Sequence, residues 1–229
     1  MRTVLFLLTV VVCQFGFIQA QDSGSGKFTD SRDGHDYAWI KIGTQVWMAE
    51  NLAYLPSVSP SAAYSTYQAH YYVYGYEGAD LQEALNTNYK KYGVLYNWEA
   101  ANTACSPGWH LPTDMEWKTL EKYLGMQAAE VEKDDIRETG NVGIKLKSRS
   151  GWTLKTANGD NSSGFNALPA GYRYQTGGFY SLGYEAHFWS ATDDQKENRW
   201  DRSLYYASDG VHRFNPLRIY GYSVRCVRN

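Results

Sequence analysis

The chain has no surplus of charge of either sign. Among its 229 residues, 22 Lys and Arg face 24 Asp and Glu, which gives a formal net charge of -2 at pH 7. A protein that binds nucleic acid needs a basic surface against the phosphate backbone, so we expect no nucleic-acid partner. Charged residues make up 20% of the chain and hydrophobic residues 43%, which excludes both a disordered polymer and a bundle of membrane helices.

The sequence also lacks the motifs of common enzymes. It has no G-x-S-x-G elbow, no Walker loop and no G-x-G-x-x-G after a strand. Its 5 histidines lie far apart and form no H-E-x-x-H pair. Neighbouring carboxylates such as Asp134 and Asp135 point in different directions on a helix or strand, so they do not form a glycosidase couple. We therefore expect a protein that is not an enzyme.

Long hydrophobic runs are missing after residue 20. Met1 and Arg2 give a short positive start, residues 4–18 are almost wholly apolar, and Ala20 is a small residue at a cleavage position. This run of about fifteen residues is shorter than the ~20 that a spanning helix needs, so it predicts a signal peptide over residues 1–20 rather than a membrane anchor. We expect a secreted or cell-surface protein, with the periplasm left open, and no membrane span after cleavage.

Cysteine is scarce, with 3 in the chain. Cys13 falls within the predicted signal peptide, so cleavage leaves Cys105 and Cys226 in an oxidising compartment, where an even pair usually forms a bridge. The bridge would close a loop of about 120 residues and stabilise the fold by about 5 kcal/mol in the chain-entropy model. The alternative, a reactive or metal-binding pair, lacks a third sulfur or a nearby histidine.

After the signal peptide the pattern indicates one domain over residues 28–229. Residues 21–27 form a polar leader that we expect to be a disordered tether. Two β-rich runs within residues 36–48 flank Gly43 and Thr44, which predicts a hairpin. Residues 57–78 mix tyrosines with Ser, Ala and Gly without a helical or strand period, so we expect a long irregular loop.

Helix signals are concentrated in the middle of the chain. Thr113 and Glu116 form a capping box, and Gly125 ends the predicted helix. Further helices are predicted over residues 97–103 and 127–137. The strands predicted for the second half are 144–147, 164–168, 187–192, 203–207, 211–214 and 222–227. Alternation along the last strand turns Cys226 inward and Arg225 to the opposite face.

Aromatic residues are abundant, with 20 Tyr, 8 Trp and 8 Phe. Four tryptophans stand beside apolar neighbours in dense motif segments, and we expect them in the core: Trp47, Trp109, Trp117 and Trp189. The tyrosines of residues 57–78 allow two interpretations, a surface that stacks on sugars or a loop fixed by ring packing.

Several segments carry a resemblance to a known family. Residues 105–117 read CSPGWHLPTDMEW and residues 41–52 read KIGTQVWMAENL, with further matches at residues 92–98, 164–172, 188–190 and 223–227. In this order they resemble the Fibrobacter succinogenes major paralogous domain family, over about residues 28–229. Members look like exported or surface proteins with paired cysteines and no settled biochemical activity.

The helix entry at residues 111–117 and the terminal run at residues 224–227 also resemble the C-type-lectin-like superfamily. That resemblance implies an α+β fold of small antiparallel sheets, two or three helices and long irregular loops. The sequence departs from the lectins in lacking a Glu-Pro-Asn calcium loop, and Trp200-Asp201 is only a fragment of Trp-Asn-Asp. It also lacks the further cysteine arrangement of the formylglycine-generating enzymes, which share the fold.

We therefore expect a secreted, non-catalytic binding or adhesion module for a glycan or a surface protein. A structural component of the cell envelope and a cryptic enzyme of the formylglycine-generating type are the alternatives. The candidate ligand contacts are the tyrosines in stretches without core periodicity: Tyr67, Tyr71, Tyr72, Tyr74, Tyr174, Tyr180 and Tyr184. No cofactor is expected unless calcium binds at Asp193, Asp194 and Asp201, which equally suit a solvated loop.

Overall fold

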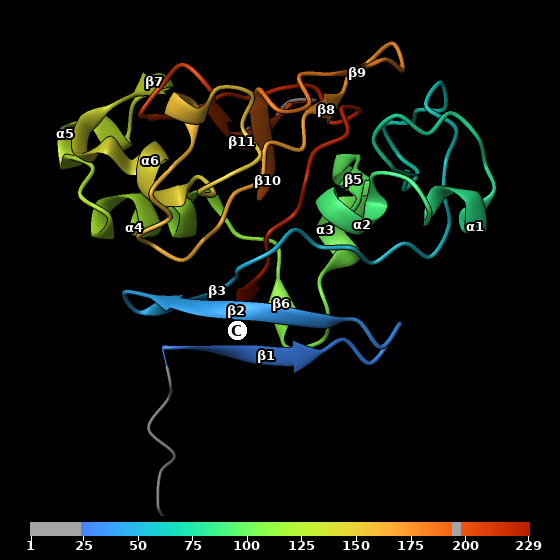
Figure 1. Ribbon diagram of the computed structural model, residues 1–229, viewed down its shortest axis with the longest axis horizontal. Coiled ribbons are helices and arrows are strands. Elements are labelled where there is room, and N and C mark those ends of the chain that lie inside the picture. Colours follow the sequence, from blue (N-terminus) through green and yellow to red (C-terminus); the bar gives the residue numbers. More distant parts are fainter. Residues whose placement is uncertain (1–23, 194–197) are drawn as a thin grey trace, which may run out of the picture.

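Segments from both ends of the sequence meet in one antiparallel sheet, the lower layer of Figure 1. The computed structural model describes residues 24–193 and 198–229. The strands follow the order β1-β2-β3-β13-β6. Their bounds are β1 Ser25–Thr29, β2 Asp36–Ile42, β3 Gln45–Met48, β13 Val227–Arg228 and β6 Trp109–His110. Val227 pairs with Trp47 on one side and His110 on the other, so the last strand lies between early ones.

The start of this sheet corrects the predicted polar leader. Strand β1 begins at Ser25 and Lys27 pairs with Ala38, so residues 25–27 are part of the fold. The ring of Phe28 stacks on Tyr37 and Trp109 at centroid distances of 5.5 and 4.5 Å, which anchors the strand. Composition alone does not reveal such an edge strand, because its residues are mostly polar and exposed. The predicted signal peptide over residues 1–20 lies outside the described residues.

The predicted hairpin is confirmed. Strands β2 and β3 pair from Trp39–Met48 to Ile42–Gln45, which leaves Gly43 and Thr44 as the turn. Gly43 has a φ of +62°, a conformation that glycine adopts at little cost.

A second sheet forms the upper layer, with the order β10-β11-β12-β7. Its strands are β10 Glu185–Asp193, β11 Arg199–Tyr205, β12 Val211–Arg213 and β7 Asp135–Arg137. The predicted strand 187–192 falls within β10, whereas 203–207 overlaps only the end of β11 and 211–214 extends one residue past β12. Two small ribbons complete the strands: β4 Tyr71–Tyr72 with β5 Leu95–Tyr96, and β8 Tyr172–Arg173 with β9 Phe179–Tyr180.

The helices are short and mixed among the strands, so the fold is α+β. Helix α4 spans Asp114–Tyr123, and its capping box between Thr113 and Glu116 is present as predicted. Helix α3, Trp98–Ala104, is capped by Asn97 and matches the second predicted helix. The other helices are α1 Leu81–Ala84, α2 Tyr89–Tyr92, α5 Ala128–Val131, α6 Val142–Leu146, η1 Thr139–Asn141 and η2 Lys155–Ala157.

Four predicted elements are wrong or incomplete. Residues 144–147 belong mainly to helix α6, because Val142 and Leu146, four residues apart, are buried on one helical face. Residues 164–168 contain only an isolated bridge at Ala167, and the predicted helix 127–137 divides into α5 and β7. Within residues 222–227, Tyr222 and Ser223 form isolated bridges, and the strand itself starts at Val227.

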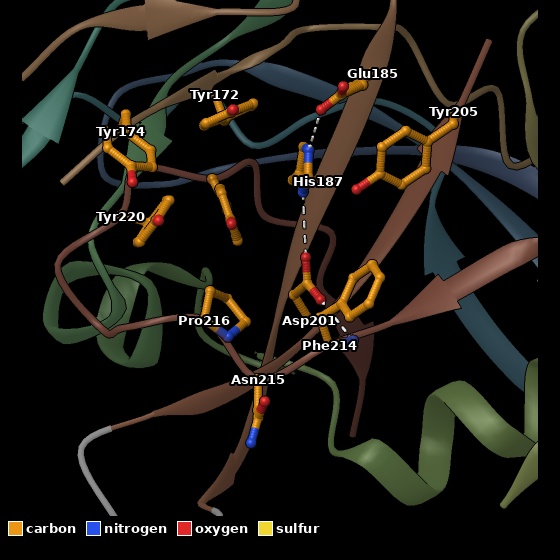
Figure 2. A pocket seen from close by; sticks show the side chains of 11 residues that line it. Tyr172, Tyr174, Glu185, His187, Asp201, Tyr205, Phe214, Asn215, Pro216 and Tyr220 are labelled. Atoms are coloured by element: carbon orange, nitrogen blue, oxygen red, sulfur yellow. Dashed lines mark hydrogen bonds and ion pairs between the residues drawn. The ribbon is translucent and has the colours of Figure 1, made fainter. Parts of the chain in front are cut away.

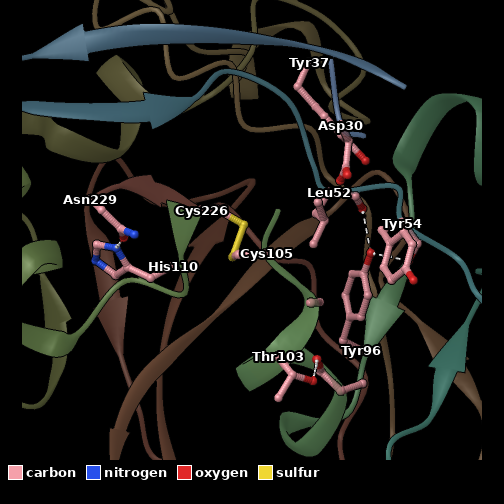
Figure 3. The surroundings of a disulfide bond; sticks show 12 residues. Asp30, Tyr37, Leu52, Tyr54, Tyr96, Thr103, Cys105, His110, Cys226 and Asn229 are labelled. Carbon is pink, nitrogen blue, oxygen red and sulfur yellow. Dashed lines mark hydrogen bonds between the residues drawn. A yellow bond between two sulfur atoms is a disulfide. The ribbon is translucent and has the colours of Figure 1, made fainter. Parts of the chain in front are cut away.

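The hydrophobic interior consists of two clusters. One contains Trp109 and Trp189 with Tyr96, and the other contains Trp47 and Trp117 with the ring of Phe165. All four tryptophans that the sequence assigned to the core are buried, as predicted. Cys105 and Cys226 form a disulfide whose Cys226 side belongs to the first cluster (Figure 3). The bridge joins the end of α3 to the residue just before β13.

Candidate functional site

A cavity of about 370 Å³ opens beside the second sheet (Figure 2). Its polar lining comes from β10, β11 and the loop after β12: Glu185, His187, Asp201 and Asn215. The rest of its lining is aromatic or apolar: Tyr172, Tyr174, Tyr205, Phe214, Pro216, Tyr220 and Tyr222. A concave site with a few converging polar groups on an apolar wall is the usual form of a ligand pocket.

Strand alternation puts the polar groups on one face of the sheet. Glu185 and His187 are two residues apart on β10 and therefore share a face. On β11, Tyr205 lies opposite Glu185, and Asp201 lies opposite Trp189. Phe188 and Leu204 alternate with these residues and are buried in the second core cluster. The sheet thus separates the pocket from that core.

A chain of hydrogen bonds crosses the pocket from Glu185 to Asp201. His187 Nε2 lies 2.9 Å from Glu185 Oε2, and His187 Nδ1 lies 3.2 Å from Asp201 Oδ2. The backbone N–H of Phe214 donates to the other oxygen of Asp201 at 3.1 Å. Because both ring nitrogens face carboxylates, the arrangement favours an imidazolium that donates on both sides.

The pKa shifts agree with this charge state. Burial alone would lower the pKa of His187, but its bonds to Asp201 and Glu185 outweigh burial and raise the pKa above the ordinary value of 6.5. Burial alone would raise the pKa of Glu185, but the hydrogen bond from His187 leads the contacts that bring it below 4.5. With two carboxylates and one imidazolium, the pocket carries one net negative charge.

Aromatic rings enclose the ionic chain. The ring of Tyr222 stacks on His187 at 4.6 Å, and the rings of Tyr172 and Tyr205 meet it edge-on at 4.9 and 6.0 Å. Burial raises the pKa of Tyr205 and Tyr220 far above 10, and so keeps both phenols neutral at physiological pH.

A second hollow of about 280 Å³ adjoins the first and is lined by Tyr172, Tyr174, Thr176 and Tyr180. Tyr172 and Tyr174 line both hollows, and we refer to the two together as the groove, with an acidic end at Glu185 and Asp201 and a neutral end at Tyr180. Gly171 makes this possible: its φ is +63°, and a Cβ there would lie 2.3 Å from the carbonyl oxygen of Tyr180. Any larger residue would displace the β8–β9 ribbon that carries the tyrosines.

Arg173 fixes this ribbon to the irregular tyrosine segment. It lies between Tyr172 and Tyr174 and is fully buried. Its Nε and Nη2 donate to the carbonyl of Ser61 at 2.9 and 2.6 Å, and its Nη1 donates to the carbonyl of Ile219 at 2.9 Å. Arg173 therefore positions the two shared tyrosines and the residue before Tyr220.

The structure separates the seven predicted tyrosine contacts into three groups. Tyr174 and Tyr180 line the groove. Tyr72 is buried, and its hydroxyl donates to the carbonyl of Ala63 at 2.7 Å, so its place among the surface contacts was wrong.

The remaining four predicted tyrosines line neither hollow of the groove. Tyr71 and Tyr74 are half-buried and pack against Tyr96 and Phe179. Tyr67 and Tyr184 are exposed. The packing of Tyr71, Tyr72 and Tyr74 corresponds to the other interpretation, a loop fixed by its rings.

The predicted calcium ligands do not come together. Asp201 is buried and bound to His187 and Phe214, whereas Asp193 is exposed and pairs with Arg199 at 2.9 Å. Asp194 lies outside the described residues. Within residues 24–193 and 198–229, no group of three or more His, Cys, Asp or Glu could hold a metal ion. Strand register keeps Asp193 and Asp201 apart, because Asp201 pairs with Trp189, which lies four residues before Asp193 on the neighbouring strand.

Sequence reasoning missed Glu185 and His187. A Glu-x-His pattern on a strand puts both side chains on one face, and that signal was readable. Their connection to Asp201 and to Tyr220 depends on strand register and on the path of the C-terminal segment, which the local pattern does not encode.

Comparison with known proteins gives one match. The sequence model of the Fibrobacter succinogenes major domain matches residues 40–228. No curated protein and no solved structure matches the chain. In the part of the chain that the structure describes, every helix is too short or too polar to cross a bilayer.

Proposed function

Because the chain belongs to the Fibrobacter succinogenes major domain family, whose model it matches over most of its length, we propose that it is an exported, non-catalytic binding module. Its ligand is a glycan, held in the groove of Tyr172, Tyr174, Tyr180 and the Glu185–His187–Asp201 chain. The scaffold is of the C-type-lectin type. Support for that assignment comes from two chain ends in one sheet, few helices and long irregular loops.

The observation that carries the proposal is the groove itself. Tyrosine rings offer flat apolar faces for the C–H faces of sugars, and they also present hydroxyl groups. Glu185 and Asn215 lie beside these rings and supply hydrogen-bonding groups for sugar hydroxyls. A groove of two adjoining hollows suits consecutive rings of a chain better than one compact molecule.

Binding is favoured over catalysis by the state of His187. A general base needs a ring nitrogen within reach of the substrate proton. Both nitrogens of His187 are occupied by carboxylates of the protein, and its side chain is buried. The residue therefore suits a structural and electrostatic role in the pocket.

Glycan binding tests the proposal. Purified protein lacking residues 1–20 is screened on a glycan array, and the ligands found are titrated by calorimetry. Tyr174→Ala should weaken binding by about tenfold or more, because it removes a ring on which a sugar can stack. The comparable stacking of a nucleobase on an aromatic side chain contributes about 1–3 kcal/mol. Tyr67→Ala is the matched control, because Tyr67 is 84% exposed and lines neither hollow.

Equal weakening by both variants, or by neither, would move the site away from the groove. The absence of binding to any glycan by the folded protein would instead favour a structural role in the cell envelope. Export is tested separately by the N-terminus of the protein recovered outside the cytoplasm, which should begin at Gln21.

A further inference from the structure

Among residues 24–193 and 198–229, no basic side chain at the acidic end of the groove balances its second carboxylate. Glu185, Asp201 and His187 together leave one negative charge, and none of the described residues that line the cavity is Lys or Arg. Two buried arginines that adjoin lining residues in the sequence direct their guanidiniums elsewhere. Arg173 donates to backbone carbonyls, and Arg202, next to Asp201, pairs with Glu121 at 2.6 Å on the far side of the sheet. An anionic ligand would therefore meet repulsion here.

The ring walls add to this preference. A cation over the face of a tyrosine is attracted by the quadrupole of the ring, and the attraction grows when water is excluded. The ring centroid of Tyr220 lies 6.3 Å from that of Tyr172 and 5.1 Å from that of Tyr174. These rings and Glu185 line the same cavity, so a cation bound there can contact a ring and the carboxylate together.

Desolvation of Glu185 on binding favours a positively charged ligand over a neutral one. The side chain of Glu185 is 20% exposed, and a ligand that fills the cavity removes this remaining water. Covering a carboxylate with a neutral group costs free energy that a hydroxyl group offsets only in part. A ligand ammonium offsets it more fully, because the resulting hydrogen bond is charge-assisted.

The neutral hollow next to the acidic one indicates what carries the cation. It shares Tyr172 and Tyr174 with the acidic pocket and adds Tyr180, so a second flat platform follows directly. A lysine side chain would occupy the acidic pocket and leave this platform empty, whereas a sugar chain fills both. We propose that the groove selects glycans whose sugars carry a free, protonated amino group, with the ammonium beside Glu185. This inference rests on the proposed function.

Two oligosaccharides that differ only in acetylation provide the test. The probes are a β-1,4-linked glucosamine tetramer and its fully N-acetylated counterpart, titrated calorimetrically against the protein at about pH 5.5, where His187 is protonated. The free-amine tetramer should bind about tenfold more tightly, which corresponds to about 1.4 kcal/mol. The preference should shrink as salt is raised, because a partly exposed ion pair is screened.

Glu185→Gln identifies the charge that matters. It should reduce the preference for the free amine to about threefold or less, because it removes the charge that favours the ammonium over the acetylated group. The matched control is Glu138→Gln, an exposed carboxylate after β7 that lines neither hollow. It should retain the full preference.

The outcomes separate this inference from the proposed function. Equal affinity for the two tetramers, or an undiminished preference in Glu185→Gln, overturns the charge inference while leaving glycan binding intact. Binding of neither tetramer, nor of any other glycan, overturns both. Tighter binding of oligolysine than of the glucosamine tetramer overturns the choice of a sugar as the carrier of the cation.

Discussion

Two groups of buried arginines differ in what balances their charge. Arg137, Arg202 and Arg213 lie between helix α4 and the second sheet, and carboxylates surround them. Arg173 and Arg225 lie among irregular segments and donate to carbonyl oxygens. All five are buried, so each must satisfy its donors within the protein.

In the first group Glu121 and Asp114 each pair with two guanidiniums, and Asp134 also accepts from Arg213. Glu121 accepts from Arg137 at 2.7 and 2.8 Å and from Arg202 at 2.6 Å. Asp114 accepts from Arg202 at 2.8 Å and from Arg213 at 2.9 Å. Burial would lower the pKa of Arg202, but Glu121 and Asp114 outweigh it and raise the pKa; for Arg137 burial dominates and lowers it.

In the second group Arg225 binds two segments that are distant from it in the sequence, residues 48–51 and residues 165–166. Its Nε donates to the side-chain oxygen of Asn51 at 2.9 Å, and its other donors reach the carbonyls of Met48, Phe165 and Asn166. Burial lowers the pKa of Arg225 to about 9, yet the guanidinium remains protonated at neutral pH.

The two groups show where a buried arginine needs a carboxylate and where backbone carbonyls suffice. Between regular elements the backbone is already satisfied, so a buried charge there requires opposite charge from side chains. In irregular segments the carbonyls lack ladder partners, and a guanidinium with five donors satisfies several at once. The first group joins α4 to the sheet, and the second holds the loops that shape the interior and the groove.

Removing the shared carboxylate should have the largest effect. Glu121→Gln leaves Arg137 and Arg202 without their common counter-charge, and the free energy of unfolding should fall by about 3–5 kcal/mol. Chemical denaturation measures the loss. The control Glu132→Gln removes the carboxylate that pairs with Lys118 but is 60% exposed, and should leave stability nearly unchanged. A loss for Glu121→Gln as small as that of the control would contradict the assigned role.

At Arg225 the number of hydrogen-bond donors, rather than the charge, should determine how much a substitution lowers the free energy of unfolding. Arg225→Lys keeps the charge but has three donors on a single nitrogen, so some carbonyls lose their partner and unfolding should become easier by about 2–3 kcal/mol. Arg149→Lys, at an exposed arginine, should change stability by less than about 0.5 kcal/mol. Equal stability of Arg225→Lys and the wild type would show that charge alone suffices.

Low pH should reduce the stability that the carboxylate-paired arginines contribute, and should leave the contribution of Arg173 and Arg225 unchanged. Burial would raise the pKa of Asp114, but Arg213 and Arg202 outweigh it and hold the pKa far below 3.8. Its contribution is therefore present above the unfolded pKa of about 3.9 and is lost as pH falls toward the folded value, by about 2 kcal/mol.

Denaturant midpoints between pH 7 and pH 2 measure this loss. Asp114→Asn should flatten the acid slope, whereas Arg225→Lys should keep the slope of the wild type. The same slope in Asp114→Asn as in the wild type would assign the acid sensitivity to other carboxylates.

The smallest effect on stability is expected at Arg173. Arg173→Lys should lower the free energy of unfolding by about 1 kcal/mol, because the carbonyls that Arg173 binds lie outside both main sheets. Affinity for the glycan should fall more than stability does, because Tyr172 and Tyr174 flank Arg173. Unchanged affinity in a folded Arg173→Lys variant would mean that the arginine does not position the groove.

Local signals in the sequence predicted a large share of the fold. The capping box at Thr113 and Glu116, the turn at Gly43 and the buried tryptophans each depend on neighbouring residues, and the structure has them. The cysteine pair followed from the predicted compartment, and the structure joins the two.

The errors fall where tertiary contacts override a local pattern. Alternation predicted only that Arg225 lies on the face opposite Cys226; that it is buried there depends on carbonyls from two distant segments. Tyr174 and Tyr180 were predicted as contacts, whereas Glu185, His187 and Tyr220 were not. Their meeting requires the C-terminal segment to run beside β8 and β10, which the bridge between Arg173 and Gly221 records.

The place of β13 in the first sheet has a consequence for the order of folding. Val227 lies between Trp47 and His110, so the sheet lacks an inner strand until residues 227–228 have been synthesised. A nascent chain that ends near residue 220 can form the β2–β3 hairpin and helix α4, but β3 and β6 then have no strand between them. Long-range pairing of this kind folds slowly. The first sheet therefore closes only after residues 227–228 have been synthesised, however early its other strands form.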